Sequence, residues 1–271
     1  MVVMGRRPSF GVVLLATHGW SKEGHILTSR IAQGLLEPEA AAAVANLLSD
    51  YANGDLSSLC VWADQIQKWY RYRWTSPLHF IDTPAGACSG LSLSAGRKGR
   101  VLPVQSKTLP HNFCSSGRDL WIVSPMHVGF TSDEGGNTIA LRWFRHKSNL
   151  DHVWDREIIL TALKDYYENN LDTLQEDLVG NFTDGIWHDD VASWEQCDDL
   201  LQCSNKYATE SITIACKWGY NGIKYGQTLA EEYFYSKMPI LMKRIAQGGV
   251  RLAMILNKVL GGSEEGFTAA T

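Results

Sequence analysis

The sequence lacks a long apolar run after its N-terminal region, and it lacks an excess of positive charge. No later stretch approaches the ~18 consecutive apolar residues of a membrane-spanning helix, so we expect the mature chain not to span a membrane. The formal net charge is -4 and the pI is about 6.1, which excludes the global basic field that drives non-specific binding to duplex DNA. Internal repeats are also absent. If nucleic acid is a ligand, local cations or metal ions must therefore hold it.

The apolar content, in contrast, is sufficient for a substantial core. Of the 271 residues, 45% are hydrophobic and 20% charged, which fits one large or two small globular domains. Apolar residues at helical spacing dominate the pattern, and the predicted fold is all-α with no internal repeat. The predicted helices cover residues 26–36, 37–51, 56–74, 156–178, 184–201, 206–218 and 227–260, the last of them broken near Pro239.

The N-terminus is typical of a secretory signal peptide. Arg6 and Arg7 precede an apolar run at 10–16, and small residues follow at Thr17 and Gly19. We expect cleavage after Gly19, which removes residues 1–19. The protein is then expected to follow the secretory pathway and to be secreted or vacuolar.

Six cysteines would lie in a compartment that permits disulfides. Cys197 and Cys203 are close enough in sequence to close a small loop. Asn181 begins the triplet Asn-Phe-Thr, which is a glycosylation acceptor and agrees with export. The remaining cysteines are Cys60, Cys88, Cys114 and Cys216.

The stretch 125–155 carries the strongest candidate metal ligands. His127 precedes a turn rich in acidic residues and glycine at 133–136, and Asp151 and Asp155 follow it. If the segment after Asn149 is helical, both carboxylates project from one face, because they lie four positions apart. Imidazole with carboxylate is a ligand set that suits zinc and similar divalent ions. The alternative is a turn histidine followed by exposed helix charges.

Two further groups could contribute ligands. Cleavage after Gly19 would free the α-amino group of Trp20, which lies within a turn or so of the Trp20 carbonyl and His25. Asp64 stands among apolar neighbours, where a carboxylate is costly unless it is paired or bound to metal, and His79 follows the same predicted helix.

One long segment has no recognisable secondary structure. Residues 86–124 are rich in Gly, Ser and basic residues, with neither helical period nor strand alternation, so we interpret them as loop or disorder. Roughly forty such residues are unusual inside a compact domain. The tail 261–271 is expected to be flexible.

Five motifs occur in an order that resembles one family, the secreted zinc-dependent type I nucleases of plants and fungi, or nuclease S-one/P-one family. The resemblance is closest to the plant branch and covers about 20–84 and 125–260. The motifs are Trp20-x4-His25, Trp62-Ala63-Asp64, Leu78-His79-Phe80-Ile81-Asp82, Pro125-Met126-His127-Val128-Gly129 and Asn149-Leu150-x2-Val153-Trp154-Asp155.

The resemblance implies a single-domain helical fold over 20–260, similar to bacterial zinc phospholipase C, with three zinc ions in a cleft. It assigns one zinc to Asp64 and His79 together with a further His and Asp. A second zinc would be held at positions 127, 151 and 155. The third would take the Trp20 amine and carbonyl, His25, and the same further Asp.

The activity that the resemblance implies is endonucleolytic hydrolysis of single-stranded DNA and RNA to 5′-phosphate products, with 3′-nucleotidase activity on nucleotides. Phe80 resembles the aromatic residue on which a nucleobase stacks. Asp82 resembles the carboxylate that orients the attacking water, and it forms the expected catalytic pair with Asp64. Cys88 would pair with Cys216 in the family's long-range disulfide, and we expect a monomer.

The chain also departs from the family pattern. Gly117 and Trp121 stand where the family has a histidine and an aspartate ligand, and Asp151 stands where it has histidine. Ser29 replaces a cysteine expected to pair with Cys60. These departures imply fewer than three zinc ions. They leave open a degenerate, non-catalytic member of the family, and the phospholipase-like fold leaves open hydrolysis of lipid phosphodiesters.

Overall fold

The computed structural model describes residues 20–48, 50–59, 69, 70, 83, 88 and 124–261 of the chain. Several sequence predictions lie outside these ranges. They are the signal peptide at 1–19, the Cys60 thiol, most of the helix predicted at 56–74, the site residues Asp64, His79, Phe80 and Asp82, nearly all of 86–124, and the tail beyond 261.

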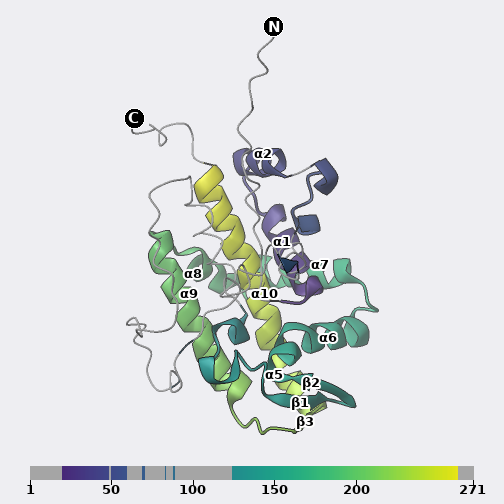
Figure 1. Cartoon of the computed structure of the whole chain (residues 1–271). Helices are drawn as coiled ribbons and strands as arrows, with labels where there is room; N and C mark the ends of the chain where they lie inside the picture. The colour runs from purple at the N-terminus through teal and green to yellow at the C-terminus, as the bar shows by residue number, and fades with distance from the viewer. Residues whose placement is uncertain are drawn as a thin grey trace.

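The described part is helical, as predicted, with one small sheet (Figure 1). Its α-helices are α1 (Lys22–Gly34), α2 (Pro38–Leu47), α5 (Leu150–His152), α6 (Ile158–Tyr166), α7 (Leu171–Thr183), α8 (Val191–Glu195), α9 (Leu200–Ile214) and α10 (Glu231–Leu260). The 3-10 turns are η1 (Asp50–Ala52), η2 (Leu56–Leu59), η5 (Pro125–Val128), η6 (Thr131–Asp133) and η8 (His188–Asp190), and the π-helical turns are η7 (Val153–Glu157) and η9 (Ala215–Tyr220). The strands are β1 (Ala140–Trp143), β2 (His146–Asn149) and β3 (Thr228–Leu229).

Helix α10 is the central element of the fold. It crosses the middle of the molecule in Figure 1 and packs along α1, with further contacts to α2, α6, α7 and α8. A side chain at Gly249 would place its Cβ 2.4 Å from Ile31 Cγ2, so only glycine allows α10 and α1 to approach this closely. The C-terminal two-thirds of α10 is buried almost continuously, which anchors the bundle around it.

The predicted break of this helix at Pro239 is wrong, because α10 runs through it. Proline removes the hydrogen bond that its N–H would have donated to the carbonyl of Tyr235. Tyr235 and Pro239 both lie on the exposed side, where water can satisfy that carbonyl. Buried residues such as Leu241 and Phe234 hold the helix on both sides of the proline.

The single helix predicted over 156–178 is also wrong, since the chain bends between α6 and α7. Glu168 and Asn169 adopt positive φ values of 50° and 59°, which ends the first helix. The side chain of Asn170 then caps α7 by accepting hydrogen bonds from the N–H groups of Asp172 and Thr173. The apolar residues keep their helical spacing across this break, so the sequence pattern predicted one helix where there are two.

The remaining helix boundaries shift in a similar way. The helix predicted at 26–36 corresponds to α1, which begins earlier. The helix predicted at 37–51 corresponds to α2, which ends earlier and is followed by the turn η1. The helix predicted at 184–201 is reduced to η8 and α8. The helix predicted at 206–218 begins at Leu200 and continues into η9.

The three-stranded sheet was not predicted. β1 pairs antiparallel with β2, in a register that sets Ala140 opposite Asn149, and parallel with β3. Leu141 and Trp143 point into the core while Arg142 between them is exposed, which is the alternation of a half-buried strand. The strands are too short for this alternation to stand out in the sequence.

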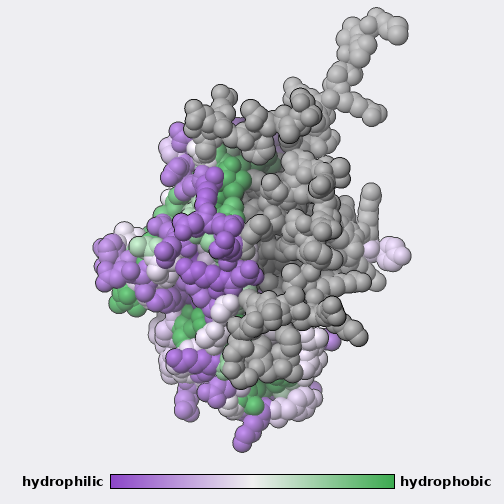
Figure 2. Space-filling view, turned by 90° about the vertical axis from the view of Figure 1, so that its left-hand side faces the viewer, coloured by the Kyte–Doolittle hydropathy of each residue, from purple (hydrophilic) through white to green (hydrophobic). Residues whose placement is uncertain are grey.

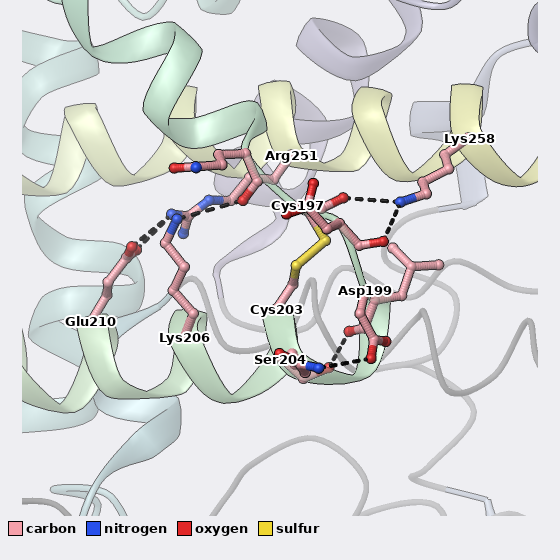
Figure 3. The surroundings of a disulfide bond; sticks show 12 residues. Cys197, Asp199, Cys203, Ser204, Lys206, Glu210, Arg251 and Lys258 are labelled. Atoms are coloured by element: carbon pink, nitrogen blue, oxygen red, sulfur yellow. Dashed lines mark hydrogen bonds and ion pairs between the residues drawn. A yellow bond between two sulfur atoms is a disulfide. The ribbon is translucent and has the colours of Figure 1, made fainter.

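Two disulfides join described residues. Cys88 is bonded to Cys216, 128 positions away, and Cys197 is bonded to Cys203. In Figure 3 the second bond closes a loop that Lys258 of α10 also holds, because its Nζ donates to the carbonyl oxygens of Cys197 and Asp198 at 3.0 and 2.8 Å. Both pairings are those expected from the sequence.

A buried ionic cluster links α9 to α10 beside that disulfide (Figure 3). Glu210 accepts hydrogen bonds from Arg251, at 2.9 and 2.7 Å, and from Arg244, at 3.2 Å. Arg251 and Arg244 are only 1% and 3% exposed. Burial, and then the positive charge of Arg251, lower the pKa of Arg244 to about 10. Two buried guanidinium groups therefore share the Glu210 carboxylate.

One face of the described part is mostly polar. In the view of Figure 2, hydrophilic residues cover most of the coloured area and hydrophobic residues show as separate areas among them. Among the described helices, none combines the length and the apolar character needed to cross a bilayer.

We predict that Glu210→Gln destabilises the protein by about 3 kcal/mol, because it removes the negative charge that two buried arginines share. Glu176→Gln, on the exposed face of α7, is the matched control and should change stability by less than about 0.5 kcal/mol. Urea denaturation of both variants measures the difference. Equal midpoints in the two variants would contradict the role assigned to Glu210.

Candidate metal centre

Three side chains from three different elements meet at one point. His127 lies on η5, Asp151 on α5 and Asp155 on η7. One ligand atom from each falls within 4.8 Å of the other two. The structure therefore assembles the three residues that the sequence predicted as ligands in the stretch 125–155.

Local structure explains why the two carboxylates face the same way. The side chain of Asn149 accepts a hydrogen bond from the N–H of His152 at 2.7 Å and so starts the helical segment that was expected there. The chain then widens into the π-helical turn η7, and such turns are frequent at functional sites. Asp151 and Asp155 stay on one face, while His152 between them is exposed.

Glycines let the turn after η5 fold back against the histidine segment. Gly135 has φ +66° and its Cβ would lie 2.7 Å from the carbonyl oxygen of Met126. Gly136 has φ +90° and its Cβ would lie 3.2 Å from the backbone nitrogen of Asp151. Side chains at either position would be strained and would crowd the segments that carry His127 and Asp151.

Asp155 is the best-connected member of the cluster. Its Oδ2 lies 2.9 Å from His127 Nε2, and its Oδ1 accepts a hydrogen bond from Ser124 Oγ at 2.9 Å. Its backbone carbonyl accepts the N–H of Ser21 at 2.8 Å. The last bond ties the start of α1 to the cluster.

The pKa of Asp151 reports the electrostatics of the site. Burial and then the negative charge of Asp155 raise this pKa, whereas His127 and a hydrogen bond from Asn137 lower it, and the net change is from 3.8 to about 8. Asp151 is buried and Asp155 partly buried, and two carboxylates this close together cannot both stay ionised without a compensating positive charge. A divalent cation would supply that charge, and one imidazole with two carboxylates is a donor set that fits it.

Trp20 and His25 lie near the cluster but outside the three-residue group. Trp20 is buried, and a side chain at Gly24 would collide with its Cβ at 2.4 Å. His25 is fully buried on the first turns of α1, where its carbonyl oxygen accepts a hydrogen bond from Ser29 Oγ. Ser21 connects this segment to Asp155, as described above.

Two contacts at the site were not anticipated from the sequence. Ser124 holds Asp155, and no spacing rule pointed to a serine directly before the Pro-Met-His triplet. Thr83 forms a parallel bridge with Phe130, donating its N–H to the Gly129 carbonyl at 2.9 Å and accepting the N–H of Thr131 at 3.0 Å. Such long-range pairings leave no signature in a single sequence.

Comparison with known proteins identifies the family. A family model described as S1/P1 Nuclease matches residues 20–104 and 122–261. The chain belongs to the S1/P1 nuclease family. This confirms the resemblance carried by the five motifs, and with it the assignment to enzymes that cleave phosphodiester bonds. The interruption of the match, over 105–121, contains Gly117 and Trp121, the positions at which the resemblance led us to expect a histidine and an aspartate.

The relatives place the chain in the plant branch of the S1/P1 nucleases. It is 57% identical to Endonuclease 1 of Arabidopsis thaliana over 277 residues, covering 92% of this chain and 91% of the relative. Endonuclease 2 of the same plant is 42% identical over 269 residues, covering 90% and 91%. Nuclease P1 of Penicillium citrinum is 24% identical over 271 residues, covering 89% and 98%.

We predict that the metal-free protein loses stability as the pH rises from about 4 to about 8. Folded Asp151 keeps its proton up to a pKa of about 8, whereas the unfolded chain releases it near 3.8, so the unfolded state binds fewer protons across this window. Asp151→Asn should remove most of the pH dependence, and the exposed Asp165→Asn should leave it unchanged. Thermal melting in chelator at several pH values measures it. An equal fall with pH in Asp151→Asn would contradict the assignment.

Proposed function

We propose that the chain is a secreted, zinc-dependent endonuclease that hydrolyses phosphodiester bonds of single-stranded DNA and RNA to 5′-phosphate products, with 3′-nucleotidase activity. The observation that carries this proposal is the convergence of His127, Asp151 and Asp155 within one 4.8 Å group. The group lies inside the region that matches the S1/P1 nuclease family.

In this proposal His127, Asp151 and Asp155 hold a divalent ion, with Ser124 fixing the orientation of the Asp155 carboxylate. Zinc bound there would lower the pKa of a coordinated water toward neutrality and neutralise the phosphate oxygens. The three residues are mostly shielded from solvent, with Asp151 9% exposed and the His127 and Asp155 side chains 16% and 14% exposed, which limits competing water at the site. Asp151 in place of histidine makes the donor set more anionic.

The segment that carries the expected base-binding and water-orienting residues is proposed to face this ion. Thr83 directly follows Asp82 in the sequence, and its pairing with Gly129 and Thr131 supports the proposal, because these residues follow His127 closely. Phe80 would stack on an unpaired base, which favours single strands over duplexes. Asp82 would orient the attacking water.

We propose that the other two zinc sites of the family keep only part of their ligands in this chain. Cleavage after Gly19 would expose the Trp20 amine beside His25, and the Ser21 contact with Asp155 supports a place for them near the ion. Asp64, with its catalytic role, and His79 would hold a further ion. The replacements at 117 and 121 remove ligands from both of these sites, so we expect fewer than three zinc ions.

Passage through the secretory pathway is supported by the two disulfides, which fit an oxidising compartment. Asn181 is proposed as a glycosylation site. It lies in the last turn of α7, where its side chain is partly exposed and donates to the Asp177 carbonyl, and Thr183 two positions later is exposed. A monomer is proposed, as the sequence led us to expect.

The alternative from a different class is a family member that keeps the scaffold and binds nucleotides without cleaving them. The missing ligands at 117 and 121 favour this alternative. Hydrolysis of lipid phosphodiesters is the third possibility, which the Phe80 base-stacking position disfavours.

We predict that Asp155→Asn lowers hydrolysis of single-stranded DNA by at least about 100-fold, because it removes a charged ligand at the centre of the cluster. His152→Ala, three positions earlier and exposed, is the control and should retain activity. The assay follows cleavage of a labelled single strand and identifies the 5′ end of the products, with melting curves to check folding. An active Asp155→Asn variant would contradict the proposed site, and an inactive wild-type chain that still binds nucleotides would support the non-catalytic alternative.

A further inference from the structure

Two lysines and two aromatic rings gather where η9 and the first turns of α10 meet. Lys237 Nζ lies 5.1 Å from the ring centroids of both Trp218 and Tyr233, and Lys217 Nζ lies 5.0 Å from that of Trp218. Tyr233 and Lys237 share a face of α10, because they lie four positions apart. We call these four residues the lysine–tryptophan patch.

Within the part of the chain that the structure describes, no acidic partner balances the positive charge of the patch. Among the described residues, neither Lys217 nor Lys237 forms an ion pair, although Lys243 further along α10 pairs with Asp190. Neither lysine has an acidic residue three or four positions away on its own helix. Partial burial lowers the pKa of Lys237. Two ammonium groups are thus held close together with their charge available to a ligand.

The rings that hold the lysines are fixed by the core. Trp218 and Tyr233 are partly buried and pack against the main hydrophobic cluster. Tyr233 donates its hydroxyl hydrogen to the Gly219 carbonyl at 3.3 Å and accepts the indole N–H of Trp154 at 2.8 Å. The packed core therefore holds the aromatic side chains of the patch in place before a ligand binds.

The residues that support the patch also neighbour the metal centre. Trp154 directly precedes Asp155, and Gly219 lies against Met126, the residue before His127, since a Cβ at Gly219 would be 3.1 Å from Met126 Sδ. η9 also packs against η5. The patch and the metal centre are therefore built on neighbouring segments of the chain.

We propose that Lys217, Trp218, Tyr233 and Lys237 bind the backbone phosphates and a base of a single-stranded nucleic acid whose scissile bond lies at the metal centre. This subsite rests on the proposed nuclease function. Lysine binds phosphate as a point charge, and an aromatic ring accepts any base by stacking, so the combination suits a strand of any sequence. An acidic peptide would use the lysines and leave the rings without a role.

The test measures binding and cleavage separately. A fluorescent twelve-residue thymidine oligonucleotide is titrated with metal-stripped protein over a range of salt concentrations, so that hydrolysis plays no part. Lys217→Ala combined with Lys237→Ala should weaken binding and reduce the slope of log K against log salt by about 1.4, because each lost phosphate contact on a single strand contributes about 0.7. Trp218→Leu should weaken binding about tenfold at an unchanged slope.

The matched control is Lys206→Ala, which removes the same charge from α9. Lys206 is exposed and lies 11 residues before Lys217, about 16 Å along the helix. This variant should keep the wild-type affinity and slope, and replacing both patch lysines with arginine should retain binding. In the cleavage assay, the double lysine variant should raise KM about tenfold for the twelve-residue strand and leave a dinucleotide unaffected, because a dinucleotide occupies only the metal centre.

Two outcomes would overturn the proposal. The first is a double variant that binds the oligonucleotide like the wild type with the same salt slope, which would mean that the lysines only cover Trp218. The second is an equal loss in Lys206→Ala, which would mean a diffuse effect of net charge. If the double variant shows the predicted change in slope but the wild type cleaves nothing, the subsite stands and the nuclease proposal fails.

Discussion

The close approach of Asp151, Asp155 and His127 is the constraint on which this part of the structure depends. The two carboxylates repel each other, and the raised pKa of Asp151, which is buried, agrees with a metal-free site that resists a second negative charge. The surrounding chain nevertheless imposes this geometry, through the Asn149 cap and the glycine turn. A site that is unfavourable without a cation, yet well supported by its neighbours, is organised to hold one.

The sequence predicts the features that depend on local spacing. Asp151 and Asp155 face the same way because they lie four positions apart in a segment that Asn149 caps. The spacing of the two aspartates and the asparagine before them are both visible in the sequence. The pairing of Cys88 with Cys216 came from the family resemblance, because no spacing rule links residues so distant. Long-range contacts such as Ser124 with Asp155 lack a local signal altogether.

The errors have similar physical causes. Pro239 predicted a break in α10, but tertiary packing on both sides and exposure of the freed carbonyl outweigh the lost hydrogen bond. The stripe across 156–178 hid a bend at Glu168 and Asn169, because hydrophobic periodicity continues through a short turn when both helices face the same core. Local propensity is a weak guide wherever burial decides the outcome.

The central claim is that His127, Asp151 and Asp155 hold zinc, and zinc content tests it most directly. Elemental analysis of the purified mature chain, dialysed without added metal, should find at least one zinc per chain. His127→Ala, checked for folding, should lower that content by about one zinc, because it removes the imidazole ligand. A folded wild-type protein without zinc, or equal zinc in the two proteins, would contradict the account.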